Sequence, residues 1–82
     1  MFLVYIIESL KDQSYYVGHT QDIKDRLKRH NEGRSKSTKN KTPWKLVYTE
    51  EYETKSEATK RECRIKKMKS RKYIDELINQ NK

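Results

Sequence analysis

The sequence has 82 residues, of which 39% are charged, and its formal net charge is +8. A chain of this length forms one small domain with a modest core, which excludes a second domain. The excess of lysine and arginine favours a polyanionic partner, nucleic acid first, over a neutral metabolite. Disorder is the alternative for so charged a chain, but six Tyr, one Trp and runs of Ile, Leu and Val indicate a core.

The single cysteine, Cys63, excludes an internal disulfide framework and a zinc site built from paired cysteines. A reduced, cytoplasmic setting is therefore expected. The apolar residues 2–7 form a run too short for a membrane span and lack a preceding basic stretch. We expect neither a secretory signal nor a membrane partner, and the run is typical of a buried strand.

Residues 2–8 and 15–20 are rich in β-branched and aromatic side chains, and a polar segment separates them. This pattern predicts a β-hairpin. Side chains alternate between faces along a strand, so a connecting loop with an even number of residues and no bulge places Tyr5 and Tyr16 on one face. The two phenols are then expected to be neighbours.

A first helix is predicted over residues 22–31, with Thr20 as its cap and Gly33 as its end. Residues 33–43 contain no apolar side chain and predict an exposed, mobile basic loop that ends at Trp44. Its four cationic side chains are those of Arg34, Lys36, Lys39 and Lys41.

A third strand is predicted over residues 44–53, where the side chains alternate. The alternation places Leu46 and Tyr48 on one face of this strand and Val47 and Thr49 on the other.

Two further helices complete the chain. Thr54 and Glu57 form a capping box for a helix over residues 56–69, and Ser70 is expected to cap the last helix. The apolar stripe of that last helix consists of Tyr73, Ile74, Leu77 and Ile78. The order strand, strand, helix, strand, helix, helix predicts an α+β domain with a small antiparallel sheet packed by helices.

Charged side chains lie on helix faces that should be apolar. Arg26 and His30 fall in the apolar stripe of helix 22–31, and Glu62 falls within the short apolar stripe of helix 56–69. Burying an unpaired charge costs several kcal/mol, roughly, so these groups need partners or a solvent-facing cleft.

Structural explanations exist for each of these residues taken alone. Arg26 and Glu62 can pair with each other, His30 can be a satisfied core histidine, and Tyr5 and Tyr16 can be strand-packing residues. Taken together, two phenols, an arginine, one or two histidines and a carboxylate form a device suited to cutting a phosphodiester. The carboxylate can hold a divalent cation, the arginine can clamp phosphate oxygens, and a phenol or imidazole can activate water.

These residues resemble the GIY-YIG nuclease family over essentially the whole chain. The first motif corresponds to LVY at residues 3–5 and the second to YVG at residues 16–18. Arg26 follows the second tyrosine by ten residues, and His30 comes four residues later. Glu62 lies in EATKRECRIKKM, which resembles the family's helix with its metal-binding glutamate.

The resemblance implies one domain over residues 1–82, built as a three-stranded antiparallel sheet flanked by three helices in the order β-β-α-β-α-α. This agrees with the elements predicted above.

The resemblance also implies a role for each matching residue. Glu62 would bind one Mg²⁺ or Mn²⁺, and Arg26 would contact the scissile phosphate. Tyr5 would be the base for the attacking water, Tyr16 would position water or phosphate, and His30 would relay a proton. Which tyrosine is the base stays open.

Three further positions bear on the resemblance to the family. Gly18 would let strand and substrate approach closely where the chain leaves the sheet. His19 stands where repair nucleases of the family tend to carry lysine, so it is a further catalytic residue that could assist a phenol. Leu3 replaces the glycine of the first motif.

The leading hypothesis is a metal-dependent endonuclease acting on DNA that is branched, damaged or single-stranded. The alternative is a nucleic-acid-binding module of the same fold with little or no cleavage, acting with a partner protein. Its tyrosines and Trp44 would stack on bases, and Arg34, Lys36, Lys39 and Lys41 would track phosphates. A third is an interaction subunit that lends its module to a larger partner. RNA as substrate and a homodimer that supplies specificity also stay open.

Overall fold

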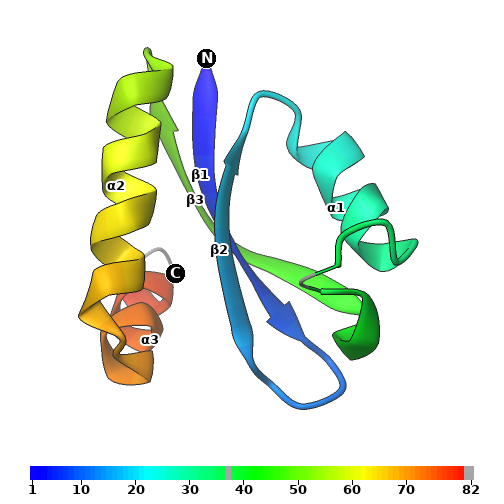
Figure 1. Cartoon of the computed structure of the whole chain (residues 1–82). Coiled ribbons are helices and arrows are strands. Elements are labelled where there is room, and N and C mark those ends of the chain that lie inside the picture. The colour runs from blue at the N-terminus through cyan, green and yellow to red at the C-terminus, as the bar shows by residue number, and fades with distance from the viewer. Residues whose placement is uncertain (37, 81–82) are drawn as a thin grey trace.

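The computed structural model of the protein describes residues 1–36 and 38–80. Its sheet has three antiparallel strands in the order β2-β1-β3, so β1 is the central strand and the other two are edges (Figure 1). The strands are β1 (Phe2–Ser9), β2 (Tyr15–Thr20) and β3 (Trp44–Tyr52). The helices are α1 (Ile23–Asn31), α2 (Lys55–Met68) and α3 (Arg71–Gln80), with a short 3-10 helix, η1 (Lys39–Lys41). The predicted α+β class and element order are confirmed.

The hairpin register brings the two site tyrosines onto one face. Tyr5 lies opposite Gly18, and Ile7 lies opposite Tyr16, with residues 9–14 as the even-numbered connection. Because alternate residues share a face, Tyr5 and Tyr16 lie on the same side, with ring centroids 6.4 Å apart. The same-face prediction is confirmed.

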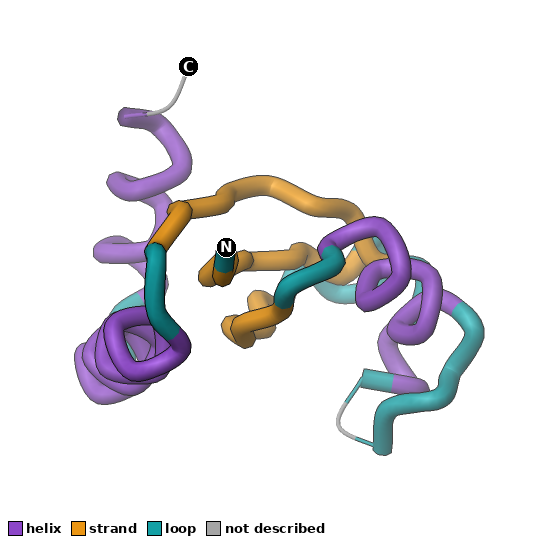
Figure 2. Tube along the Cα trace, turned by 90° about the horizontal axis from the view of Figure 1, so that it is seen from above, coloured by secondary structure: helices purple, strands orange, loops and turns teal. Residues whose placement is uncertain are grey.

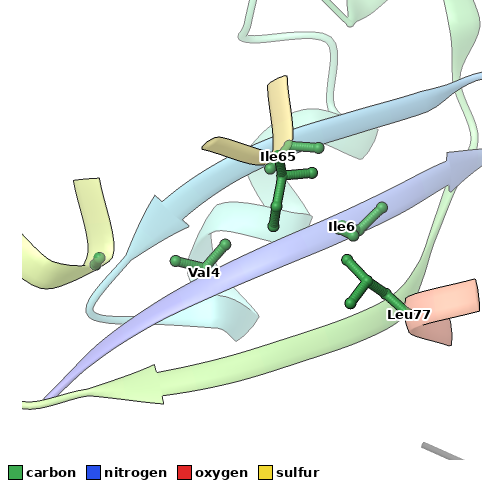
Figure 3. Close-up of a cluster of buried hydrophobic side chains, with 6 residues drawn as sticks. Val4, Ile6, Ile65 and Leu77 are labelled. Carbon is green, nitrogen blue, oxygen red and sulfur yellow. The ribbon is translucent and has the colours of Figure 1, made fainter. Parts of the chain in front are cut away.

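The helices cover both faces of the sheet. Seen from above, α2 and α3 lie on one side of the strands and α1 lies on the other (Figure 2). Each face has its own apolar cluster, because successive residues of β1 point to opposite sides. Val4 and Ile6 pack with Ile65 and Leu77 under α2 and α3 (Figure 3). The cluster toward α1 contains Tyr5, Ile7 and Trp44, with the partly buried Tyr16, Ile23, Leu27 and Leu46 against it.

The predicted alternation in β3 is wrong at a bulge. Between Ile6 and Ile7 the pairing with β3 shifts from Tyr48 to Leu46, so Val47 has no directly opposite partner. An extra residue reverses the faces on either side of it. Leu46 therefore packs toward α1, whereas Tyr48 packs toward α2 and α3.

The cap of α1 lies two residues after the predicted one, and the helix begins one residue later than predicted, at Ile23. Asp22 is the cap and accepts a hydrogen bond from the backbone N–H of Asp25 at 3.1 Å. Thr20 ends β2, and its hydroxyl accepts from the N–H of Asp22 at 3.1 Å instead. Gly33 follows the helix with a φ of 76°, as predicted for a helix stop.

The predicted caps of the other helices are confirmed. The hydroxyl of Thr54 accepts from the N–H of Glu57 at 3.2 Å, and Ser70 accepts from the N–H of Tyr73 at 3.1 Å. No helix among the described residues is long and apolar enough to cross a membrane.

The basic loop over residues 33–43 is tied to the core rather than being exposed throughout. Thr38 is fully buried, and its carbonyl accepts from the indole N–H of Trp44 at 2.9 Å. Ser9, also fully buried, donates to the carbonyl of Lys41 at 2.7 Å. Ser37, which the predicted loop includes, lies outside the described residues.

Candidate active site

Tyr5 and His30 meet between the sheet and α1. Tyr5 comes from the central strand and His30 from the last turn of α1, and each is at most 2% exposed. The Tyr5 hydroxyl lies 2.9 Å from Nε2 of His30, and Nδ1 of His30 lies 2.7 Å from the hydroxyl of Thr38. Both nitrogens of the imidazole therefore have partners inside the protein.

The pKa values of this pair allow the Tyr5 hydroxyl to donate to His30. Burial, reinforced by the neighbouring Arg26, lowers the pKa of His30 below 6.5. Burial and then Tyr16 raise the pKa of Tyr5 to about 12, against the opposing effect of Arg26. At neutral pH both groups are uncharged, so the phenol can donate to Nε2 while Nδ1–H donates to Thr38.

Glu62 projects from α2 toward the outer edge of β2. One carboxylate oxygen makes a close hydrogen-bond contact with Nδ1 of His19, and the other accepts from Nζ of Lys66 at 2.6 Å. Burial alone would raise the pKa of Glu62, but the hydrogen bonds from Lys66 and His19 outweigh it and hold the pKa below 4.5. Glu62 is therefore ionised at neutral pH.

A small cavity of about 110 Å³ collects the predicted site residues. Every predicted catalytic residue except His30 lines this cavity. His30 lies behind Tyr5 and contacts its hydroxyl. The lining residues are Tyr5, Tyr16, Gly18, His19, Arg26 and Glu62. They come from both strands of the hairpin and from the helices on opposite faces of the sheet.

An adjoining cavity of about 420 Å³ shares Tyr16 and Arg26 with the first and extends along α1. Arg29, Arg34 and His30 also line it. Three guanidinium groups on its wall make it suited to an anionic chain that reaches the smaller cavity.

Gly18 makes room for the phenol of Tyr5. A Cβ at this position would lie 2.6 Å from the Tyr5 hydroxyl oxygen and 2.8 Å from the adjoining ring carbon. No side chain tolerates contacts that short. The expectation that the glycine serves substrate approach at the end of the strand is therefore wrong, because Tyr5 occupies that space and the strand continues to Thr20.

The structure tests the possibility that the charged residues Arg26 and Glu62 pair with each other. Glu62 pairs with His19 and Lys66 rather than with Arg26, although Arg26 lines the same small cavity. His19 contacts that carboxylate and also lines the small cavity together with both phenols.

The predicted nucleic-acid-binding residues divide into two groups. Arg34, Lys36, Lys39 and Lys41 are exposed on the basic loop. Trp44 is 4% exposed, packs in the cluster toward α1 and donates its indole N–H to Thr38. A base cannot stack on a buried ring, so the prediction for Trp44 is wrong.

The residues of the small cavity fit a divalent cation held through one protein carboxylate. Within residues 1–36 and 38–80, no cluster of three or more His, Cys, Asp or Glu could enclose a metal ion. Mg²⁺ commonly binds one or two carboxylates and takes its other ligands from water and phosphate. Glu62 has an ionised carboxylate at the cavity wall. It could bind the cation if Lys66 or His19 released the carboxylate oxygen that it contacts.

Sequence reasoning missed two residues of the site. Lys66 follows Glu62 by four residues, a spacing that places both on one helix face, so the pair was detectable from sequence. Thr38 lies in a segment without apolar residues, and nothing local to that segment indicates burial. Only the packing of the loop against α1 and Trp44 brings its hydroxyl to His30.

A model of the GIY-YIG catalytic domain matches residues 1–74. The chain belongs to the GIY-YIG family. Among curated relatives, a UPF0213 protein of Listeria innocua is 46% identical over 70 residues, covering 84% of this chain and 77% of that protein. A UPF0213 protein of Halobacterium salinarum is 45% identical over 69 residues, covering 83% of this chain and 88% of that protein.

A solved structure agrees with this assignment. The solution NMR structure of a UPF0213 protein from Bacillus halodurans has a TM-score of 0.62 and 36% sequence identity. The alignment covers 98% of this chain and 85% of that one. The chain is therefore a small GIY-YIG domain of the UPF0213 kind, a member of a nuclease family.

Proposed function

We propose that this GIY-YIG domain is a divalent-metal-dependent endonuclease that hydrolyses phosphodiester bonds of DNA. The observation that carries the proposal is the convergence of Tyr5, Tyr16, Arg26 and Glu62 on one small cavity. These four side chains come from β1, β2, α1 and α2, and a merely structural contact would not require so many chemically matched groups.

The residues divide the work of hydrolysis. Arg26 binds non-bridging phosphate oxygens, and Tyr16 orients the phosphate or the attacking water. The water gives a proton to the Tyr5 oxygen as the phenol passes its own proton to Nε2 of His30. The water oxygen bonds to phosphorus, and the bond to the leaving oxygen breaks.

Two features of the chain support this route. A phenol with a pKa near 12 stays protonated at neutral pH, so Tyr5 needs an acceptor for its proton, and the neutral His30 is 2.9 Å away. A cation held by Glu62 would neutralise phosphate charge and stabilise the leaving oxygen.

The alternative is a binding module of the same fold with little or no cleavage, which acts with a partner protein. The exposed cations of the basic loop favour it, because Arg34, Lys36 and Lys39 suit contact with phosphates. The binding-module hypothesis explains the net charge of the chain, but it gives no role to the ionised Glu62 at the cavity.

Cleavage of a labelled substrate panel by the purified chain separates the two functions. The panel contains duplex, single-stranded, flapped and four-way DNA, and RNA, each with Mg²⁺, Mn²⁺ or EDTA. We expect at least one DNA substrate to be cut with metal and none in EDTA. If every substrate is bound and none is cut with either metal, the binding module is the better description.

Thr38 is expected to be a positioning residue for His30. Thr38→Val keeps the shape of the side chain but removes the acceptor for Nδ1–H, so the imidazole can switch tautomer and lose its acceptor for the Tyr5 proton. Cleavage should fall roughly 10–100-fold, the usual range for groups that orient another functional side chain. Thr38→Ser should restore it, because serine keeps the hydroxyl.

A pH profile separates this role from a loss of packing. His30 must be neutral to accept a proton. Because its pKa is lowered from the ordinary histidine value of 6.5, activity should hold at that pH and decline only as the pH falls through the lowered pKa. Thr38→Val removes a partner of the imidazolium, which should move this decline to lower pH. An unchanged rate and profile in Thr38→Val would show that the hydroxyl positions nothing.

A further inference from the structure

A third cavity lies on the other side of Tyr16, between β2 and the junction of α2 and α3. Its volume is about 380 Å³, and it shares Tyr16 and Lys66 with the site described above. Tyr16 lines both cavities, and Lys66 lines this one while holding Glu62. A ligand in this cavity would therefore lie beside the small cavity that Tyr5, Tyr16 and Glu62 line.

The wall of this cavity is cationic and aromatic, and its floor is apolar. Among the described residues that line it, none is acidic, and three are cationic, Lys66, Lys69 and Arg71. The guanidinium of Arg71 lies over the ring of Tyr15 at 4.6 Å, and Nζ of Lys66 lies 5.8 Å from the centre of the Tyr16 ring. The floor contains Val17, Ile65 and Ile74.

Arg71 and the ring beneath it are held in place by neighbouring groups. Arg71 donates to the carbonyl of Gln13 at 2.7 Å, and Tyr15 donates to the carboxylate of Asp75 at 2.5 Å. Arg71 is thus fixed as a flat cationic surface over an aromatic ring at the cavity wall. Such a surface suits the face of a nucleobase, and the lysines suit a phosphate.

Lys69 has a backbone conformation that lysine rarely adopts. It is the C-cap residue of α2, with φ 47° and ψ 34°, in the left-handed region where glycine or asparagine is usual. A lysine at this position adopts an unfavourable backbone conformation, and its ammonium group lies at the cavity wall. Strained residues of this kind cluster at ligand sites.

We propose that this cavity binds one unpaired nucleotide of the DNA strand next to the scissile phosphate. The apolar floor and aromatic wall accommodate the base, and Lys66 and Lys69 contact the flanking phosphate. A paired base cannot enter a cavity of one nucleotide's size, so the site selects substrates with an unpaired strand. The inference rests on the proposed nuclease function, because it places the nucleotide relative to that site.

Lys69→Gly tests the proposal, with Lys67→Ala as the matched control. Both remove one positive charge from the end of α2, but Lys67 is exposed and does not line this cavity. Binding is measured in EDTA by fluorescence anisotropy with a labelled single-stranded oligonucleotide and with a blunt duplex. Melting temperatures are measured for both variants.

Lys69→Gly should weaken binding of the single strand by roughly three- to tenfold and lower the salt slope by about one. Binding of the duplex should change less than about twofold, and Lys67→Ala should not distinguish the two probes. The melting temperature of Lys69→Gly should hold or rise, because glycine adopts the left-handed conformation without strain. A stability gain with a selective binding loss is not expected of a purely structural lysine.

Two results would overturn the proposal. One is an equal loss for both probes in Lys69→Gly and Lys67→Ala, which would indicate general charge attraction. The other is unchanged binding of the single strand in Lys69→Gly. Failure of the nuclease function is separately visible, because the binding assay contains no metal. A selective loss in Lys69→Gly supports the nucleotide site even if the wild-type chain cuts nothing.

Discussion

Glu62→Gln is expected to reduce cleavage on the order of a thousandfold while leaving DNA binding nearly unchanged. The substitution keeps the shape of the side chain but removes the charge that would anchor a divalent cation. It also replaces one of the two acceptor oxygens that hold His19 and Lys66 around the cavity with an NH2 donor. Initial rates across a range of Mg²⁺ concentrations, with binding measured in EDTA, check this expectation.

Glu76→Gln is the matched control for that variant. Glu76 is an exposed carboxylate on α3, away from the cavity, and its change removes the same charge from a helix. We expect it to cut at close to the wild-type rate. If Glu62→Gln also cuts at that rate, Glu62 is a structural partner of Lys66 and the metal-dependent mechanism is wrong.

The local features of this fold could be predicted from the sequence. Periodicity and turn chemistry predict the hairpin and the three helices. They also predict the caps at Thr54 and Ser70 and the shared face of Tyr5 and Tyr16. These features depend on residues close together in the chain, or on the fixed alternation of strands. The GIY-YIG catalytic-domain model matches residues 1–74, which contain nearly all of these elements.

The features that sequence reasoning missed depend on contacts between distant segments. Thr38 is buried because the basic loop folds back on α1, and Trp44 is buried because its indole caps that loop. The bulge beside Val47 depends on the pairing of β3 with β1. The clash that makes Gly18 necessary becomes visible only when the side chain of Tyr5 lies across the hairpin.

A polar network between β3 and α2 is another such feature. Glu50 accepts two hydrogen bonds from the guanidinium of Arg61, at 2.8 and 3.0 Å. It also accepts from the hydroxyls of Tyr48 and Tyr52. Arg61 donates in addition to Tyr73 at 3.1 Å, which links the network to α3. The side chains of Glu50 and Arg61 are only 17% and 21% exposed.

Glu50→Ala is therefore expected to destabilise the fold by about 3 kcal/mol, because it leaves Arg61 half-buried without its counter-charge. A domain of this size has about 5–15 kcal/mol of stability in total, so the melting temperature should fall by roughly 15 °C. Glu51→Ala is the control, since Glu51 is the exposed neighbour on the same strand, and it should change stability by less than about 0.5 kcal/mol. Equal effects of the two changes would show that the network does not stabilise the fold.

The pH dependence of that stability identifies the carboxylate responsible. Burial alone would raise the pKa of Glu50, but the hydrogen bonds from Arg61, Tyr48 and Tyr52 outweigh it and hold the pKa below 4.5. A carboxyl group with a lower pKa in the folded state stabilises the protein above its unfolded pKa and loses that effect as the pH falls through the folded value. Denaturant unfolding should thus show wild-type stability declining below about pH 4.5, a range set by the usual carboxyl pKa. Glu50→Ala should decline less steeply there, with Glu62 still contributing because its pKa is lowered as well.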